Sequence, residues 1–185
     1  VNLTALNASN LGSGTVPTAR LGSGTASSSV FLAGDNTWIA AGGGKLKQIK
    51  TTVTGTTYSG TSSSWTDATD FNVVITPTSA SNDILLFVNP TKVSFGSYYG
   101  FFSAKRAIDG GASTDNFCGG TYGFFWGEGP HPSGYIPAMG VAIDDDHGTT
   151  SEITYTAQFR NYNNSSTVYF GGGGQGCIIA VEYEA

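Results

Sequence analysis

Residues 45–185 form a series of short runs in which apolar and polar side chains alternate. Between 153 and 160, for example, Ile153, Tyr155, Ala157 and Phe159 fall on one face of an extended chain, and polar side chains fall on the other. No window of ten or more residues shows the apolar stripe and caps of a helix. Clusters of turn-forming residues separate nine predicted strands, at 46–54, 71–76, 84–89, 98–108, 120–126, 135–143, 152–161, 167–170 and 177–184.

This succession of strands predicts an all-β head. Short strands with irregular loops are typical of two antiparallel sheets packed as a jelly-roll-like β-sandwich. The last run, 177–183, is nearly continuous in apolar residues. We therefore expect it at the centre of a sheet, with one side available to face an axis between copies of the chain.

The first 44 residues follow another pattern. Large apolar residues recur every five positions, at Leu6, Leu11, Val16 and Leu21, and the pentapeptide Leu-Gly-Ser-Gly-Thr occurs twice, starting at Leu11 and at Leu21. Neither a helix nor a regular strand has this spacing, whereas short extended pieces joined by glycine turns do. The pattern predicts a fibrous stem.

The stem is not expected to be stable as a single chain. It holds too few large side chains to offset the conformational entropy lost when its backbone is ordered. We therefore expect three intertwined copies, with an intermolecular trimer seam that consists of Leu6, Leu11, Val16, Leu21 and Trp38. A disordered linker is the alternative, because a high content of Gly, Ser and Thr is also typical of flexible linkers.

Three consecutive glycines, Gly42, Gly43 and Gly44, mark a change in composition. Beyond them the chain becomes rich in β-branched and aromatic residues. We place the domain boundary here, with a stem and hinge over 1–44 and a β-sandwich head over 45–185.

Charge and cysteine content narrow the class of protein. Charged residues make up 11% of the chain, against about 25% in ordinary soluble domains. The net charge of −5 argues against nucleic-acid binding, which requires a basic surface. No apolar stretch of the sequence predicts membrane insertion or a secretion signal. Cys118 and Cys177 are expected to be free buried thiols, with one disulfide as the alternative. Because the chain begins at Val1 without a methionine, we expect it to be the C-terminal part of a longer protein or a processed product.

Five segments carry a resemblance to a known family. They are LNASNLGSGTVPTARL at 6–21, FLAGDNTW at 31–38, GKLKQI at 44–49, VITPTSASNDIL at 74–85 and EYE at 182–184. Together they resemble the C-terminal, receptor-binding region of bacteriophage tail fibres, of the marine phage type. The second segment often has arginine in that family where this chain has Ala33. The resemblance does not extend over 97–150.

The resemblance implies a homotrimer at the tip of a virion tail fibre, assembled in the host cytoplasm. Its heads would bind a host-surface glycan or an outer-membrane receptor, with no enzymatic activity and no cofactor. Two alternatives stay open: a purely structural virion fibre or head-decoration protein without a receptor pocket, and an enzyme that trims glycans. Stacked aromatics around a pocket favour adhesion, and two carboxylates across one cleft favour the enzyme.

Aromatic residues provide the candidate ligand site. Residues 98–102 and 122–126 read YYGFF and YGFFW, so alternation sends some rings inward and others outward. A Gly- and Pro-rich loop over 127–135 and a second loop over 161–166 are expected at the tip, where rings and amides can contact a sugar. We predict ligand binding by Trp126, His131, Tyr135 and Asn163, with core packing as the alternative for each aromatic residue.

An acidic segment, Asp144-Asp145-Asp146-His147-Gly148, is the candidate cation site. Several oxygen ligands are what Ca²⁺ requires, but adjacent aspartates point in opposite directions and the EF-hand spacing is missing. We expect a solvated acidic turn without a metal, and Asp144 and Asp146 are the ligands in the alternative. With two histidines and no Gly-x-Ser-x-Gly motif, no catalytic residue is predicted.

Overall fold

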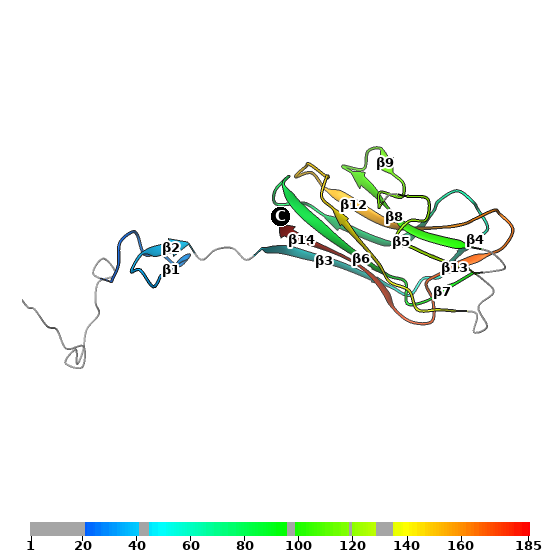
Figure 1. Ribbon diagram of the computed structural model, residues 1–185, viewed down its shortest axis with the longest axis horizontal. Coiled ribbons are helices and arrows are strands. Elements are labelled where there is room, and N and C mark those ends of the chain that lie inside the picture. The colour runs from blue at the N-terminus through cyan, green and yellow to red at the C-terminus, as the bar shows by residue number, and fades with distance from the viewer. Residues whose placement is uncertain (1–20, 41–44, 96–98, 119, 129–134) are drawn as a thin grey trace, which may run out of the picture. The chain divides into compact units, whose positions relative to one another are not determined.

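The computed structural model describes residues 21–40, 45–95, 99–118, 120–128 and 135–185. The chain divides into two compact units, Val1–Gly44 and Lys45–Ala185. In the described ranges every regular element is a β-strand, and the strands pair in antiparallel sheets (Figure 1). This confirms the predicted all-β class. Across the same ranges the chain has no helix with the length and apolar character needed to cross a membrane.

A short hairpin forms the described part of the first unit. Strand β1 (Val30–Leu32) pairs with β2 (Trp38–Ala40). In the turn, Asp35 Oδ1 accepts hydrogen bonds from the backbone nitrogen and the hydroxyl of Thr37, at 3.0 and 2.6 Å. The φ angle of Asn36 is 63°, in the left-handed region that asparagine tolerates.

The proposed seam is only partly covered by the described residues. Leu6, Leu11 and Val16 lie outside them. Leu21 is 42% exposed, and Trp38 is half-buried with no hydrogen-bond partner for its indole nitrogen in the described part of the chain. An isolated two-stranded hairpin is marginally stable. Because three of the five predicted seam residues lie outside the described ranges, the trimeric stem stays a prediction.

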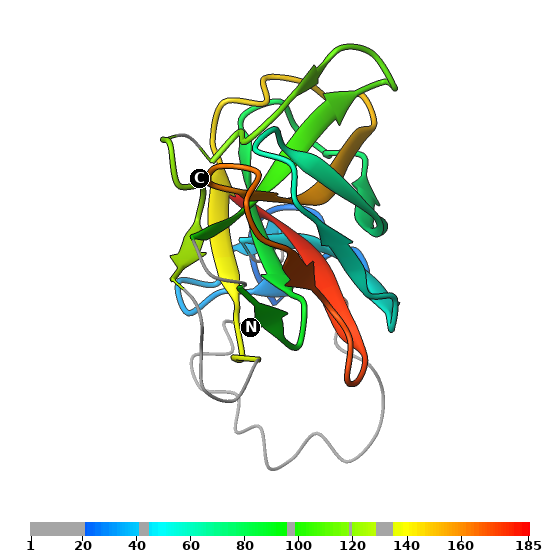
Figure 2. The ribbon, with the colours of Figure 1, turned by 90° about the vertical axis from the view of Figure 1, so that its right-hand side faces the viewer.

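Two sheets make up most of the second unit (Figures 1 and 2). The first has the strand order β11–β6–β14–β3, and the second has the order β10–β8–β12–β5 with β9 also paired to β8. A third, small sheet has the order β4–β13–β7. The bounds are β3 (Leu46–Thr54), β4 (Tyr58–Gly60), β5 (Thr66–Ile75), β6 (Asn82–Asn89), β7 (Val93–Ser94), β8 (Gly100–Ile108), β9 (Ser113–Thr114), β10 (Phe125–Gly127), β11 (Gly140–Asp144), β12 (Ile153–Asn161), β13 (Val168–Phe170) and β14 (Gly176–Glu184).

The two larger sheets share one hydrophobic core, an arrangement consistent with a β-sandwich. Strand β14 lies between β6 and β3, which confirms the predicted central place of the last run. In β12 the predicted apolar face is fully buried, since Ile153, Tyr155, Ala157 and Phe159 are each at most 1% exposed. The first sheet contributes Ile84, Leu86, Val88, Ile178 and Ala180 to the same core.

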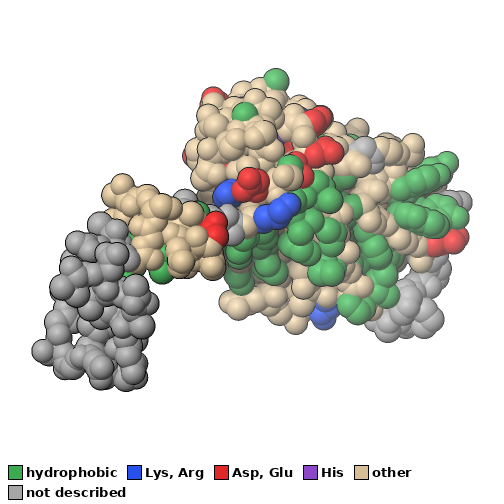
Figure 3. Space-filling view, turned by 60° about the vertical axis from the view of Figure 1, so that its left-hand side comes forward, with side chains coloured by type: hydrophobic (Ala, Val, Ile, Leu, Met, Phe, Trp, Pro, Cys, Tyr) green, Lys and Arg blue, Asp and Glu red, His purple; other side chains and the backbone are tan. Residues whose placement is uncertain are grey.

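The side of the first sheet that faces away from the core is also largely apolar. Ile49, Val53, Val141 and Ile143 lie there and are 46–56% exposed. Figure 3 shows hydrophobic side chains gathered on one face of this unit. We call this surface of the sheet the apolar outer face, and its apolar members are Ile49, Val53, Leu85, Phe87, Val141, Ile143, Cys177, Ile179 and Val181.

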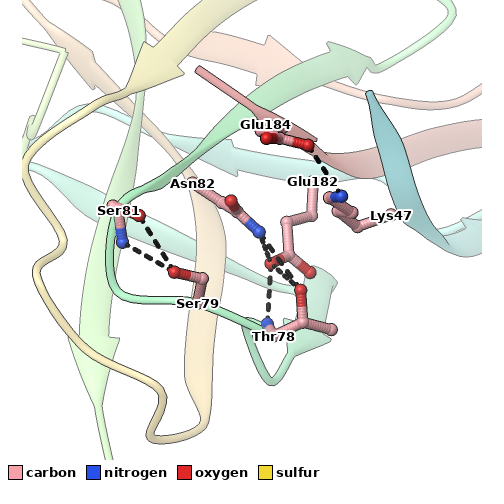
Figure 4. Close-up of polar contacts among 7 residues, drawn as sticks. All are labelled: Lys47, Thr78, Ser79, Ser81, Asn82, Glu182 and Glu184. Atoms are coloured by element: carbon pink, nitrogen blue, oxygen red, sulfur yellow. Dashed lines mark hydrogen bonds and ion pairs between the residues drawn. The ribbon is translucent and has the colours of Figure 1, made fainter. Parts of the chain in front are cut away.

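A buried carboxylate connects three segments at one end of this sheet (Figure 4). Oε1 of Glu182 accepts hydrogen bonds from Thr78 N, Thr78 Oγ1 and Asn82 Nδ2 at 2.6, 2.7 and 2.6 Å. Its Oε2 accepts one from Gln48 Nε2 at 2.6 Å. Burial raises the pKa of this carboxyl, but the hydrogen bonds from Gln48, Asn82 and Thr78 outweigh burial and lower the pKa to about 2.

Two predicted strands are shorter than expected. Of the predicted 120–126 strand only its end belongs to β10, because Gly120 and Gly123 take φ angles of 73° and 68° and turn the backbone. Of the predicted 135–143 strand only the part from Gly140 onward belongs to β11, and Pro137 has no N–H to donate to a ladder. The unpredicted strands β4, β7 and β9 have two or three residues each, too few to show an alternating pattern.

Both cysteines are free thiols, as expected. They are half-buried rather than fully buried. Burial raises the pKa of the Cys118 thiol.

Candidate functional site

Five aromatic side chains line one pocket on the outer side of the second sheet. They are Tyr99, Phe101, Tyr122, Trp126 and Tyr162, and the pocket has a volume of about 300 Å³. We call it the aromatic pocket. Phe101 is 1% exposed, whereas Tyr122, Trp126 and Tyr162 are 53–55% exposed. The pocket therefore has one buried ring and three rings that a ligand can contact directly.

The five rings of the aromatic pocket contact one another in a closed circle. Ring centroids are separated by 5.7 Å for Tyr99 and Trp126, 5.9 Å for Trp126 and Tyr122, and 5.4 Å for Tyr122 and Phe101. The circle closes through Tyr162, at 6.1 Å from Phe101 and 5.9 Å from Tyr99. These separations are those of favourable aromatic pairs. Each ring is therefore supported by two others before any ligand binds, which lowers the entropy lost on binding.

Strand pairing explains how the two aromatic runs divide between core and pocket. Trp126 of β10 lies opposite Phe101 of β8, and Phe101 lies opposite Arg160 of β12. The next residue, Phe102, points the other way and belongs to the hydrophobic core. Ring contacts and strand register thus place Phe101 in the aromatic pocket and Phe102 in the hydrophobic core.

The guanidinium of Arg160 supports the buried ring of the pocket. The guanidinium carbon of Arg160 lies 4.8 Å from the ring centroid of Phe101 and 4.8 Å from that of Trp65. Arg160 also donates a hydrogen bond from Nη2 to the carbonyl of Thr121, the residue before Tyr122. Burial lowers the pKa of Arg160. Arg160 therefore connects the floor of the pocket to the loop that carries one of its walls.

One carboxylate lies at the rim. The negative charge of Glu128 raises the pKa of Tyr99, and a hydrogen bond from the Tyr99 hydroxyl to this carboxylate acts in the same direction. Glu128 is exposed. The rim thus offers a hydrogen-bond acceptor with a fixed negative charge beside an aromatic wall.

The loop 161–166 holds another wall in place. The backbone nitrogen of Tyr162 donates to the carbonyl of Tyr99 at 3.0 Å. The side chain of the fully buried Asn161 accepts a hydrogen bond from the backbone nitrogen of Asn163 at 3.0 Å. Asn163 Oδ1 in turn accepts from the backbone nitrogen and the hydroxyl of Ser165. The predicted ligand residue Asn163 thus has a role in shaping its own loop, and ligand binding by it stays a prediction.

The other predicted ligand residues do not join the aromatic pocket. Tyr135 lines a separate pocket of about 240 Å³ with Lys92 and Ile136, where Lys92 Nζ lies 4.8 Å from the centroid of its ring. The ring of Tyr169 is 6.4 Å away from it. His131 lies outside the described residues. Trp126 is therefore the one predicted ligand residue found in the lining of the aromatic pocket.

Tyr162 is the residue of the pocket lining that is hardest to select from the amino-acid sequence. It lies 36 positions after Trp126 and directly after a buried strand. The available signal was its place at the start of a polar loop, where an aromatic side chain has no core position to fill. Tyr99, Phe101 and Tyr122 belong to the two aromatic runs noted above, but sequence alone could not separate them from core residues.

The acidic segment is part of the structural framework. Asp144 is 1% exposed and His147 is 5% exposed, so the expectation of a solvated turn is wrong for both residues. Asp144 accepts hydrogen bonds from Arg106 and from the hydroxyl of Tyr155, and Asp146 accepts one from Arg106 at 2.6 Å. These hydrogen bonds replace the ones that water would make to the carboxylate of Asp144 in a solvated turn.

No described group of three or more His, Cys, Asp or Glu side chains could hold a metal ion. Burial raises the pKa of Asp144, and the hydrogen bond from Arg106 lowers the pKa of Asp146. The buried carboxylate of Asp144 and the exposed carboxylate of Asp146 thus both pair with the guanidinium of Arg106.

Replacing Gly123 with alanine is expected to lower the free energy of unfolding by about 2 kcal/mol and to displace Tyr122 from the pocket. A Cβ there would clash with the carbonyl oxygen of Phe102, at a φ of 68°. Urea unfolding and the near-ultraviolet circular dichroism of the aromatic rings measure the two effects. Gly120→Ala is the matched control, because its φ is 73° but nothing lies within 4 Å of the added Cβ. Equal losses in the two variants would contradict this explanation.

Fold and site together define an all-β protein, consistent with a β-sandwich, that carries a solvent-open aromatic pocket. Such a pocket suits ligands that combine flat apolar faces with hydroxyl groups. Comparison with models of protein families gives no match to this chain, and a search of curated proteins gives none either.

Proposed function

We propose that this chain is the host-binding end of a virion tail fibre and that its aromatic pocket binds a carbohydrate of the host surface. The observation that carries the proposal is the closed circle of aromatic rings with a carboxylate at its rim. The repeat pattern of the first 44 residues and the resemblance to phage tail fibres support the same function.

The chemistry of the pocket suits a sugar ring. The C–H faces of a pyranose pack on exposed aromatic rings, here Tyr122, Trp126 and Tyr162, and replace water on apolar surface. Three tyrosine hydroxyls, the indole N–H and the Glu128 carboxylate supply donors and acceptors for sugar hydroxyls. A neutral or cationic sugar suits this rim better than an acidic one, since Glu128 would repel a second carboxylate.

Several copies would compensate for weak binding by each head. A pocket of this size buries one or two sugar rings, so the affinity of a single head is expected to be low. Three heads in one fibre raise the effective concentration of the pocket near the cell surface. The predicted seam of Leu6, Leu11, Val16, Leu21 and Trp38 would hold the three copies together in the stem.

Trp126→Ala and Tyr162→Ala are each expected to weaken binding to host cells or to a glycan array by about tenfold or more, because each removes one wall of the pocket. The fold should remain intact, since both side chains are more than half exposed. Tyr135→Ala, at 43% exposure in the other pocket, is the matched aromatic control and should bind normally.

The opposite pattern, with binding lost in Tyr135→Ala and kept in Trp126→Ala, would move the ligand site to the Lys92 pocket. Binding that is unchanged in all three variants would contradict the proposal and favour a purely structural virion protein. Release of reducing sugar by the wild-type chain would favour the glycan-trimming alternative.

A further inference from the structure

We propose that the apolar outer face of the first sheet is the surface through which copies of this chain contact one another. The inference deepens the proposed function, because a fibre head has to lie beside other copies of itself. It uses no residue of the aromatic pocket.

The composition of the face is that of an interface and not of a solvated surface. Across the sheet, Ile49, Val181, Leu85 and Ile143 form one continuous row of partners on β3, β14, β6 and β11. The two edge positions of this row, Ile49 and Ile143, are 55% and 56% exposed. Exposed apolar patches that extend over several strands mark interaction sites in soluble proteins.

The size of the face fits association between copies. Four strands spaced by about 4.8 Å, over about eight residues with a rise of about 3.4 Å each, span roughly 500 Å². Contact between this area on one copy and an equal area on another would bury about 1,000 Å² in total, which reaches the lower limit for a specific interface.

The charges at the two edges favour a second copy over an unrelated partner. Strand β3 carries the exposed Lys50 at one edge of the sheet, with the exposed Lys45 directly before it, whereas Lys47 is already paired with Glu184. At the opposite edge, β11 is followed by the exposed carboxylate of Asp145, whereas Asp146 is already paired with Arg106. A basic edge and an acidic edge on the same chain are complementary when copies are arranged head to tail around an axis.

The first unit provides an independent indication. Its described residues leave Phe31 49% exposed and Ile39 42% exposed on a two-stranded hairpin. A hairpin of this size is marginally stable alone. Association of identical chains covers apolar surface on both units at once, which a partner that binds only one unit would not do.

The experiment uses the full chain and two readouts. Sedimentation measures the mass of the particle against the 19.1 kDa of one chain. The rate at which a maleimide labels Cys177, followed by peptide mass analysis, reports access to the face, because this thiol lies on it opposite Val53 of β3.

The wild type is expected to sediment as a multiple of the chain mass, with Cys177 labelled about tenfold more slowly than in Ile143→Asp and Ile49→Asp. Both variants place a charge at a position that is exposed in the single chain, so the fold should persist, and far-ultraviolet circular dichroism checks it. Val74→Asp is the matched control, because Val74 is 41% exposed on β5 of the other sheet, and it should behave as the wild type.

Two results would overturn the inference. One is a wild-type chain with the mass of a single copy at its highest soluble concentration. The other is an oligomer in which Cys177 is labelled at the same rate in the wild type and in Ile143→Asp, which would mean that another surface holds the copies. Glycan binding by Ile143→Asp tests the proposed function separately, because each dissociated head should keep its aromatic pocket.

Discussion

Replacing Glu182 with alanine is expected to lower the free energy of unfolding by about 4 kcal/mol at neutral pH. The carboxylate is fully buried and accepts four hydrogen bonds from Gln48, Thr78 and Asn82. Its removal would leave buried donors without partners, and each such donor costs about 1–3 kcal/mol before water enters the space. Urea unfolding of the two proteins at pH 7 measures the difference.

The same carboxylate predicts how stability depends on pH. Its pKa is about 2 in the folded chain, against an ordinary value of 4.5. Because the folded pKa is depressed, the contribution is fully present above about pH 4.5 and is lost as the pH falls toward 2. The shift corresponds to about 3 kcal/mol. We expect Glu182→Gln to be less stable than the wild type at pH 7 and to approach it near pH 2.

Glu184→Gln is the matched control for this experiment. Glu184 lies two residues further along β14, and its carboxylate pairs with Lys47 at 2.9 Å. Its side chain is 56% exposed, so water screens the pair and its loss should have only a small effect on stability. A loss in Glu184→Gln as large as that in Glu182→Gln would show that burial and hydrogen bonding do not set the difference.

Much of the head could be predicted from periodicity because its strands are long enough to display it. Strands β12 and β14 have nine residues each. The first alternates clearly and the second is apolar on both faces, and both features are direct consequences of where these strands lie in their sheets. The failures occur where glycine or proline turns an apolar segment into a loop, as at Gly123 and Pro137. In these two segments the apolar residues are typical of a strand, but the glycine or proline prevents the backbone from continuing one.

The site was predictable only in part because a pocket depends on contacts between distant segments. Trp126 could be selected, since it ends an aromatic run beside a Gly- and Pro-rich loop. Tyr135 is closer to Trp126 in sequence than Tyr162 is, yet Tyr162 lines the aromatic pocket and Tyr135 lines another. The pairing of β8 with β12 brings Tyr162 there, and a single sequence does not specify that pairing.

Replacing Arg106 with methionine is expected to lower the free energy of unfolding by about 3–5 kcal/mol at neutral pH, because it leaves the charge of Asp144 buried without its cation. Asp144 would retain a hydrogen bond from the hydroxyl of Tyr155, which does not neutralise it. Asp146→Asn removes the other carboxylate on the same guanidinium and is the matched control. With 79% of its side chain exposed, the loss of Asp146 should cost less than about 1 kcal/mol.

The pH dependence of this loss separates charge burial from lost packing. Burial already raises the pKa of Asp144 in the wild type, and removal of the cation would raise it further. When the pKa of an acid is higher in the folded than in the unfolded chain, its ionisation lowers the free energy of unfolding. This loss begins as the pH rises through the pKa of the unfolded chain, near 4, and is complete above the pKa of the folded chain. The deficit of Arg106→Met relative to the wild type should therefore shrink between pH 7 and pH 4.5, measured by urea unfolding at each pH. A deficit that stays constant over this range would mean that Arg106 stabilises the chain through the packing of its aliphatic stem, and not by neutralising Asp144.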